Sequence, residues 1–271
     1  MSGPLLKVTD LTVRYGGVVA LDAVSFNVRE GHIVGLIGPN GAGKTSCIDA
    51  LTGFHPAHRG TVRFADDDVT TLPAHQRARR GFARTFQSLD LFEDLTVRQN
   101  LEVGVATPSW RETLTDALWR KGRQHTAVDE VLELVDIASL ADRRPTDLSN
   151  GQRHLVALAR ALVARPRLVL LDEPAAGLDE SESAALGDLL RRLPGQGATV
   201  LLVDHDMALV LSVCDRIHVL DFGRRIASGT PAAVRADPHV VAAYLGSDSP
   251  AAHAVPSVEA APATPDDGGQ P

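Results

Sequence analysis

The sequence predicts an α/β fold with a parallel sheet. Three short apolar runs, at residues 32–38, 167–174 and 198–206, have the length of buried strands. The first leads directly into a glycine loop, and the other two end in acids or histidine, as expected for parallel strands that carry functional residues at their carboxyl ends. Of the 271 residues, 44% are hydrophobic and 23% are charged, which is ordinary for a soluble α/β protein.

The first third of the chain reads as strands, turns and one helix. Strands are expected at 5–17, 20–31, 32–38 and 60–69, and a helix at 45–54 after the glycine loop. In the last of these strands, the cluster Asp66 to Asp68 favours a solvated turn over a metal site.

Residues 88–165 change to helical patterns and predict a helical subdomain. The periodic segments are 97–105, 111–122, 127–137 and 151–164. For the last of them, Ser149 is a plausible N-cap, and Pro166 lies just past the expected end. We therefore expect one domain over residues 1–246. The tail, 247–271, consists mainly of Ala, Pro, Asp and Gly, and we expect it to be disordered.

Charge and cysteine content exclude several classes of function. The net charge is −7 and no run of Lys or Arg stands out, so nucleic acid is not an expected partner. The two cysteines, Cys47 and Cys214, have no metal-ligand or CxxC spacing, which favours buried thiols in a reducing cytosol. No segment resembles a signal peptide or a membrane span, so a membrane role requires a partner subunit.

The stretch GPNGAGKT, residues 38–45, predicts a phosphate-binding loop. Its glycines let consecutive backbone N–H groups converge on an anion, and the following helix directs its positive end to the same place. Lys44 is expected to neutralise the β- and γ-phosphates, and the Thr45 hydroxyl to ligate Mg²⁺.

Asp172 and Glu173 end an apolar strand and are candidates for metal binding and for activating water. Alone, an acidic pair in this position is equally consistent with a capping or turn acid; the upstream phosphate loop favours the functional interpretation.

A second short loop, LSNGQ at residues 148–152, opens a helix and offers a second anion site. Ser149 supplies a hydroxyl, Gly151 a backbone N–H, and the helix its positive terminus. The alternative is an N-capping serine followed by a loop glycine.

Together these motifs resemble the ATP-binding cassette (ABC) family of ATPases. They occur in that family's order, as GPNGAGKT, RTFQ, LSNGQ, LVLLDEP, AGLD and VDHD, and the resemblance extends to Gly246. It implies a P-loop NTPase (RecA-like) core with an antiparallel β subdomain and an inserted α-helical subdomain. It also implies ATP and Mg²⁺ as cofactors, and two cassettes that sandwich nucleotide head to tail, so that the LSNGQ loop serves the partner's nucleotide.

The same resemblance assigns roles to individual residues. The catalytic residues would be Glu173, His205, Lys44 and Gln87. The metal ligands would be Thr45, Gln87 and Asp172. Tyr15 would stack on adenine and Asp179 would act across the dimer interface. The remaining nucleotide contacts would come from Gly38, Pro39, Asn40, Gly41, Ala42, Gly43, Lys44, Thr45, Ser46, Ser149, Gly151 and Gln152.

Without the resemblance, several of these residues have simpler interpretations. Tyr15 near a strand end is more often a packing residue, Gln87 reads as a surface amide, and a lone histidine such as His205 is usually a neutral side chain with its hydrogen bonds satisfied. His55 and His58 lie in a Pro/Gly loop without companion ligands, which argues against a metal site there.

A finer resemblance is to ATPase subunits of branched-chain amino-acid importers, carried by phrases such as RTFQSLDLFEDLTVRQNLEVG and DEPAAGLD. Asn150 departs from the signature by replacing its second glycine, Asp204 stands where a glutamate often precedes the switch histidine, and the helical segment is short for this class. The resemblance implies a motor subunit on the cytoplasmic face of the membrane. Its partners would be a second ABC ATPase subunit, in a homo- or heterodimer, transmembrane permease subunits and, indirectly, a solute-binding protein.

Three alternatives remain beside this interpretation. One is a soluble ABC ATPase acting on ribosomes or DNA, although the chain has neither a second cassette nor a basic arm. Another is an importer ATPase for urea, amides or another small solute. The third is a phosphoryl-transfer enzyme such as a small-molecule kinase, which has no use for LSNGQ or VDHD.

Overall fold

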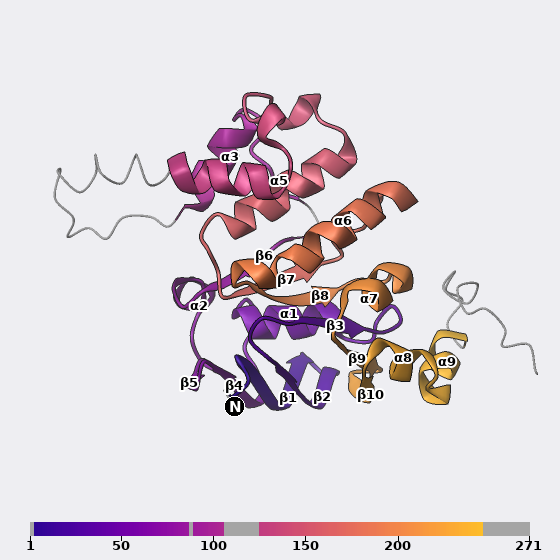
Figure 1. Ribbon diagram of the computed structural model, residues 1–271. Coiled ribbons are helices and arrows are strands. Elements are labelled where there is room, and N and C mark those ends of the chain that lie inside the picture. The colour runs from indigo at the N-terminus through magenta and orange to yellow at the C-terminus, as the bar shows by residue number, and fades with distance from the viewer. Residues whose placement is uncertain (1–2, 87–88, 106–124, 246–271) are drawn as a thin grey trace, which may run out of the picture.

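The computed structural model describes residues 3–86, 89–105 and 125–245. It contains two sheets with helices between and around them, and so confirms the predicted mixed α/β architecture (Figure 1). The smaller sheet has the strand order β2-β1-β4-β5, and the larger has the order β10-β9-β3-β8-β7-β6.

The small sheet is antiparallel and corresponds to the expected β subdomain. Its strands are β1 (Leu6–Tyr15), β2 (Val18–Val28), β4 (Arg59–Phe64) and β5 (Asp67–Asp68). Along β1, Leu6 pairs with Val28 on one side and with Phe64 on the other. The strand expected at 60–69 is instead a hairpin: Ala65 and Asp66 turn with φ of 48° and 69°, and Asp67 and Asp68 form β5, so only Asp66 of the acidic cluster lies in a turn.

The large sheet contains the buried apolar runs. Its strands are β3 (Ile33–Ile37), β6 (Phe82–Arg84), β7 (Leu168–Asp172), β8 (Thr199–Val203), β9 (Arg216–Asp221) and β10 (Arg224–Gly229). Every residue of β3, β7 and β8 is buried, because helices cover both faces, as is usual for parallel sheets. All pairs are parallel except β9 with β10.

Parallel order brings the carboxyl ends of five strands to one edge of the large sheet. The segments that leave this edge begin at Gly38 after β3, Thr85 after β6, Glu173 after β7, Asp204 after β8 and Phe222 after β9. The edge therefore collects residues from sequence positions far apart, and it is where a ligand site is expected in such a fold.

Helix α1 (Lys44–Thr52) lies between the two sheets (Figure 1). Its residues Cys47, Ile48 and Leu51 are fully buried in one cluster with apolar residues of β1, β2, β4 and the large sheet. This burial fixes the phosphate loop, which immediately precedes the helix. Cys214 is also a buried free thiol, as predicted for both cysteines.

A buried arginine supports the far end of α1. Arg77 of α2 (Ala74–Arg79) is 2% exposed, and its guanidinium donates to the carbonyl oxygens of Ala50 and Leu51. It also donates to the carbonyls of Leu72 and Thr70. A cation at the last carbonyls of a helix is favoured by the helix dipole, and these bonds compensate for its burial. Burial lowers the pKa of Arg77 to about 10.

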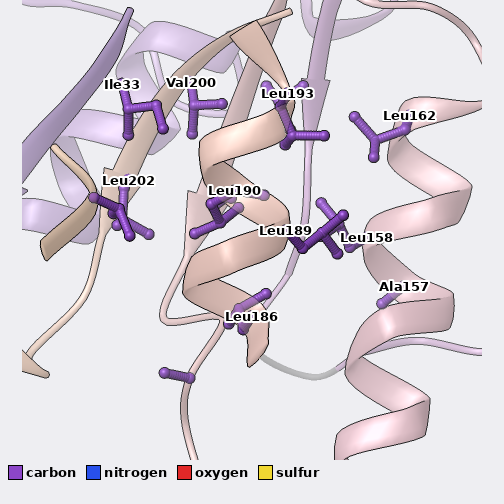
Figure 2. Close-up of a cluster of buried hydrophobic side chains, with 14 of the residues drawn as sticks. Ile33, Ala157, Leu158, Leu162, Leu186, Leu189, Leu190, Leu193, Val200 and Leu202 are labelled. Atoms are coloured by element: carbon purple, nitrogen blue, oxygen red, sulfur yellow. The ribbon is translucent and has the colours of Figure 1, made fainter. Parts of the chain in front are cut away.

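The opposite face of the large sheet is covered by α6 (Glu180–Arg192), and α5 (Asn150–Leu162) packs over α6. Figure 2 shows Leu186, Leu189, Leu190 and Leu193 between sheet residues such as Val200 and the α5 residues Ala157, Leu158 and Leu162. Leucines at positions i, i+3, i+4 and i+7 form the apolar stripe expected of a helix buried on two sides.

The helical patterns in the middle of the chain are largely confirmed. Helix α3 (Val97–Gly104) and α5 match two of them, and residues 125–134 are helical where 127–137 was expected. The short 3₁₀ helices η1 (Ala138–Leu140) and η2 (Pro145–Asp147) lead into α5. The predicted helix at 111–122, Gln87 and the tail 247–271 lie outside the described residues.

Between α6 and residue 245, the last residue described, the chain adds four short helices around the sheet. They are η3 (Pro194–Gln196), α7 (Met207–Val213), α8 (Pro231–Arg235) and α9 (Pro238–Leu245). Over the ranges that the structure describes, no helix combines the length and the apolar character needed to cross a membrane.

The buried side chain of His218, between the two sheets, makes the stability of the fold depend on pH. His218 of β9 is 3% exposed, and its ring centroid lies 5.2 Å from that of Phe26. Burial lowers the pKa of His218 to about 4; the backbone of Asn27 opposes this shift, and Arg225 and Arg216 add to it.

We expect the free energy of unfolding to fall as the pH falls below about 6.5. Between that pH and 4 the unfolded chain protonates His218 and the folded chain does not, so stability is complete above 6.5 and is lost towards 4. The full difference is on the order of 3 kcal/mol. Denaturant titrations at several pH values should show a flatter profile for His218→Gln than for wild type, whereas His75→Gln, at an exposed position, should not change it. Identical slopes for His218→Gln and wild type would contradict this.

Candidate functional site

The phosphate loop, residues 38–45, joins β3 to α1 at the carboxyl edge of the large sheet. Gly43 has φ of 99°, and a Cβ there would lie 2.5 Å from the carbonyl oxygen of Ala20 on β2. Gly38 packs as closely, since its Cβ would lie 2.2 Å from the carbonyl of Leu220 on β9. Glycine is required at both positions because backbone from other strands occupies the space of a side chain.

Lys44 points into this loop. Its Nζ donates to the carbonyl oxygens of Gly38 at 2.8 Å and Pro39 at 3.1 Å, and the residue is 6% exposed. Gly43 gives α1 no side-chain cap, and neither Thr45 nor Ser46 is fully buried. An ammonium group and a helix N-terminus thus face the same space, which is suited to a phosphate.

The C-terminal part of the chain is tied to the same loop. Gly223, in the turn between β9 and β10, donates its N–H to Ala42 and accepts from the N–H of Asp22. A cavity of about 420 Å³ lies between the loop, this turn and α9, with Asn40 and His239 in its lining. The loop is therefore supported by residues that come much later in the chain.

Two acids from the end of β7 lie near Lys44. Burial lowers the pKa of Lys44, and the carboxylates of Glu173, Asp172 and Asp204 act against that shift. Burial raises the pKa of Asp172, and Arg84 acts in the opposite direction. Glu173 has φ of 50° and donates its N–H to Val203 at 2.7 Å, so its backbone is held against β8. Its side chain is 21% exposed, which leaves it accessible to water.

His205 follows β8, and its ring lies near Glu173 and Asp204. Its Nδ1 lies 3.7 Å from Oε2 of Glu173 and 3.7 Å from Oδ1 of Asp204. Asp204 is fully buried and accepts hydrogen bonds from the N–H groups of Ala175 and Asp206. The aspartate noted as a departure in the sequence therefore joins the loops that follow β7 and β8.

Tyr15 ends β1 at the tip of the β1–β2 hairpin. It is 42% exposed, and its ring centroid lies 4.2 Å from that of His55, whose Nε2 contacts the carbonyl of Arg14. Val18 and Val19 on the same hairpin are also exposed. Because the hairpin packs on Gly43 through Ala20, an exposed apolar surface lies beside the phosphate loop, where an aromatic base could stack.

The LSNGQ loop begins α5 with a capping box. The Ser149 hydroxyl accepts from the N–H of Gln152, and the Gln152 side chain accepts from the N–H of Ser149. The N-cap interpretation of Ser149 is therefore correct. It does not conflict with an anion site, because Ser149 and Asn150 are exposed and Ser149 stands at the positive end of a 13-residue helix.

A hydrogen bond joins this loop to the segment after Glu173. The Asn150 side chain donates to the carbonyl of Gly177 at 3.0 Å. Gly151 lies against Glu182, which would clash with a Cβ at 2.3 Å, and Glu182 forms a capping box with Asp179. The backbone N–H of Glu182 holds the pKa of Asp179 below its usual value. The two predicted partner-facing loops thus form one unit, and the residue that departs from the signature links them.

The described residues fit a magnesium ion. The carboxylate of Asp172 and the hydroxyl of Thr45 are hard oxygen ligands, which this ion prefers. The side chain of Asp172 is 7% exposed and belongs to the acids that act on Lys44, so it lies beside the phosphate loop. Gln87, the third expected ligand, lies outside the described residues.

Sequence reasoning missed one charged residue at this edge. Arg84, at the end of β6, contacts Asp172 through Nη2 at 3.0 Å and Asp49 through Nη1 at 2.6 Å. Its place in the RTFQ motif, three positions before the expected Gln87, was the available signal. It could not be interpreted without knowing which acids lie beside that strand.

Comparisons with known families agree with this geometry. Residues 21–176 match the family described as ABC transporter, and residues 224–249 match the one described as branched-chain amino acid ATP-binding cassette transporter.

Among similar proteins is the high-affinity branched-chain amino acid transport ATP-binding protein BraF of Pseudomonas aeruginosa. It is 39% identical over 260 residues, which cover 91% of this chain and 99% of BraF. LivG of Escherichia coli K12, with a corresponding name, is also 39% identical over 260 residues, with the same coverage of both chains. The lipopolysaccharide export system ATP-binding protein LptB of Escherichia coli K12 is 37% identical over 243 residues, covering 90% of this chain and 98% of LptB.

Solved structures with the same fold include a nucleotide-free ATP-binding cassette from an ABC transporter and an ABC transporter cassette in its ADP conformation. Both give a TM-score of 0.79 at 31% identity; the first match covers 90% of this chain, the second 91%, and each covers 100% of the solved chain. A dimeric structure of a bacterial ABC transporter cassette gives 0.71 at 26% identity, with 83% and 98% of the two chains covered.

We expect Asn150→Asp to loosen the segment around Gly177. Aspartate keeps the size of the side chain but has no donor for the Gly177 carbonyl, so the bond of 3.0 Å is lost. Hydrogen exchange at residues 177–179 should accelerate, with a change in global stability of about 1 kcal/mol or less. Asn27→Asp, which makes the same charge change at an exposed site on β2, is the control. Unaltered exchange at 177–179 would show that the contact does not restrain the loop.

Proposed function

The chain belongs to the ABC transporter ATPase family, and on this basis we propose that it is the ATP-hydrolysing motor subunit of an importer for branched-chain or related amino acids. The observation that carries the ATPase assignment is that one sheet edge brings Lys44, Asp172, Glu173 and His205 together next to an uncapped helix N-terminus. These are the groups that phosphoryl transfer to water requires: a phosphate site, a metal ligand and a positioned base.

Binding of the nucleotide follows from the loop geometry. The phosphates lie in the loop from Gly38 to Ser46, where backbone N–H groups and the end of α1 replace water around the anion. Lys44 exchanges its loop carbonyls for phosphate oxygens, and adenine stacks on Tyr15. Thr45, Asp172 and Gln87 would hold Mg²⁺, which when bound would neutralise charge on the phosphates.

In the hydrolysis step, Glu173 accepts a proton from the attacking water. Its backbone is fixed against β8 and its carboxylate is partly exposed, so it is both oriented and accessible. His205 lies 3.7 Å from this carboxylate and contacts the γ-phosphate, which places glutamate, water and phosphate in a defined order.

Composite sites in a dimer account for the exposed Ser149 of the LSNGQ loop. Ser149, Gly151 and Gln152 of one cassette contact the γ-phosphate bound by the partner's loop, and Asp179 contacts the partner across the interface. Supporting this arrangement are the dimeric cassette with the same fold and the exposure of Ser149 and Asp179. ATP thus binds the two subunits together, and loss of the γ-phosphate releases them.

The names of the relatives support the proposed permease partner and solute. This chain acts on the cytoplasmic face of the membrane, bound to transmembrane permease subunits. A solute-binding protein delivers the solute to those permease subunits. The C-terminal match over residues 224–249 supports branched-chain amino acids, whereas overall identity alone distinguishes poorly between BraF at 39% and LptB at 37%.

Glu173→Gln should lower kcat for ATP by ~100-fold or more while ATP affinity is retained, because glutamine keeps the shape but cannot accept the proton. The slowed variant should dimerise with ATP in sedimentation, and adding Ser149→Arg should abolish that dimer by blocking the partner's phosphate site. Glu133→Gln and Ser139→Arg, at exposed positions, are the matched controls. Near-normal turnover in Glu173→Gln would count against the assigned base, and a dimer that survives Ser149→Arg would count against the composite site.

Cells that lack this chain should lose uptake of labelled leucine, isoleucine and valine, and Lys44→Ala should fail to restore it, since the amine neutralises phosphate charge. Initial uptake rates measure this, with labelled urea and an amide as alternative solutes. If only the uptake of urea or the amide is lost, the assignment as a motor subunit stands, but the proposed solute is wrong.

A further inference from the structure

Arg84 connects the two elements that carry the proposed metal ligands. It ends β6, where it pairs with Leu170 of β7, and its side chain is 9% exposed. Nη2 donates to Oδ2 of Asp172 at 3.0 Å, and Nη1 donates to Oδ1 of Asp49 at 2.6 Å. One planar guanidinium thus bridges a strand end and a helix with two charge-assisted bonds.

Asp49 lies on the face of α1 that carries Thr45, one of the proposed metal ligands. It comes four residues after Thr45, so the two side chains project from the same side of the helix. The bridge through Arg84 therefore runs from the Thr45 face of α1 to the carboxylate of Asp172.

Aromatic rings hold the guanidinium in this place. The Cζ atom of Arg84 lies 4.9 Å from the ring centroid of Phe86 and 5.6 Å from that of Phe54, and these two rings meet edge to face. Next in sequence, Thr85 accepts the N–H of Asp172 through its hydroxyl and donates its own N–H to Leu170. Asp172 is thereby fixed at its backbone by Thr85 and at its carboxylate by Arg84.

We propose that Arg84 is a positioning residue, which holds the Asp172 carboxylate at a set distance from the Thr45 face of α1. This inference rests on the proposed ATPase function, since it assigns the bridge to the metal site of that function. Arg84 acts through Asp172 and does not itself contact nucleotide.

The test compares Arg84→Gln, Asp172→Asn and the double variant in two assays. The first measures ATP affinity with Mg²⁺ and, separately, with a chelator; the second measures kcat and KM. We expect the ATP affinity of Arg84→Gln without metal to stay within about threefold of wild type. The variant should lose most of the increase in ATP affinity that Mg²⁺ gives, and its kcat should fall by ~10-fold or more. The double variant should be no worse than Asp172→Asn, because residues that act through one another are not additive.

Two further variants separate position from charge and from folding. Adding Asp49→Asn to Arg84→Gln restores the net charge but not the bridge, so the defect should persist. Arg84→Lys should recover part of the metal-dependent gain, since an ammonium reaches one carboxylate but cannot bridge both in a planar fork, and it carries the comparison if Arg84→Gln does not fold. Arg79→Gln, on the exposed side of α2, is the control.

Three outcomes would overturn the role of Arg84. The first is that the defects of Arg84→Gln and Asp172→Asn add up in the double variant, and the second is that adding Asp49→Asn restores activity. The third is that Arg84→Gln keeps a normal Mg²⁺-dependent increase in ATP affinity and only melts at a lower temperature. Lys44→Ala in the same assays tests the proposed function separately. If it abolishes nucleotide binding while Arg84→Gln behaves as wild type, only the Arg84 inference fails; if Lys44→Ala hydrolyses ATP normally, the proposed function fails.

Discussion

The parallel order of β9, β3, β8, β7 and β6 is the constraint on which the rest of the site depends. The central strands β3, β7 and β8 are short and fully buried, so most of their side chains contribute to the core, and the site residues lie at the strand ends or directly after them. Parallel pairing then places those residues along one edge, although they come from positions as far apart as 38 and 205. The antiparallel sheet contributes differently, because it covers α1 and presents the exposed hairpin with Tyr15 next to the phosphate loop.

Much of this arrangement could be predicted from the sequence, because the informative signals are local. Continuous apolar runs identified β3, β7 and β8, glycine spacing identified the loop before Lys44, and periodicity identified α3 and α5. Ser149 was recognised as an N-cap because a capping residue is defined by the few residues that follow it. The roles of the individual site residues remain predictions.

The contacts that sequence reasoning missed join distant segments. Arg84 gains its meaning from Asp49 and Asp172, 35 and 88 positions away, and β6 is only three residues long, too short for a periodic pattern. Asp204 read as a conservative departure, yet it holds two loops together through backbone N–H groups. Asn150 likewise read as a loss of glycine, whereas its side chain supplies a donor that glycine lacks.

The hydrogen bond from Gly223 to Ala42 bears on how cassettes of this kind diversify. The segment that most specifically marks the branched-chain class begins at residue 224, directly after the turn that supports the phosphate loop. Exchanging this segment with that of a related cassette would therefore affect nucleotide binding, because the junction lies next to the turn that hydrogen-bonds to the phosphate loop. In this chain, a C-terminal segment taken from another cassette would keep this support only if the graft left the turn at Gly223 intact.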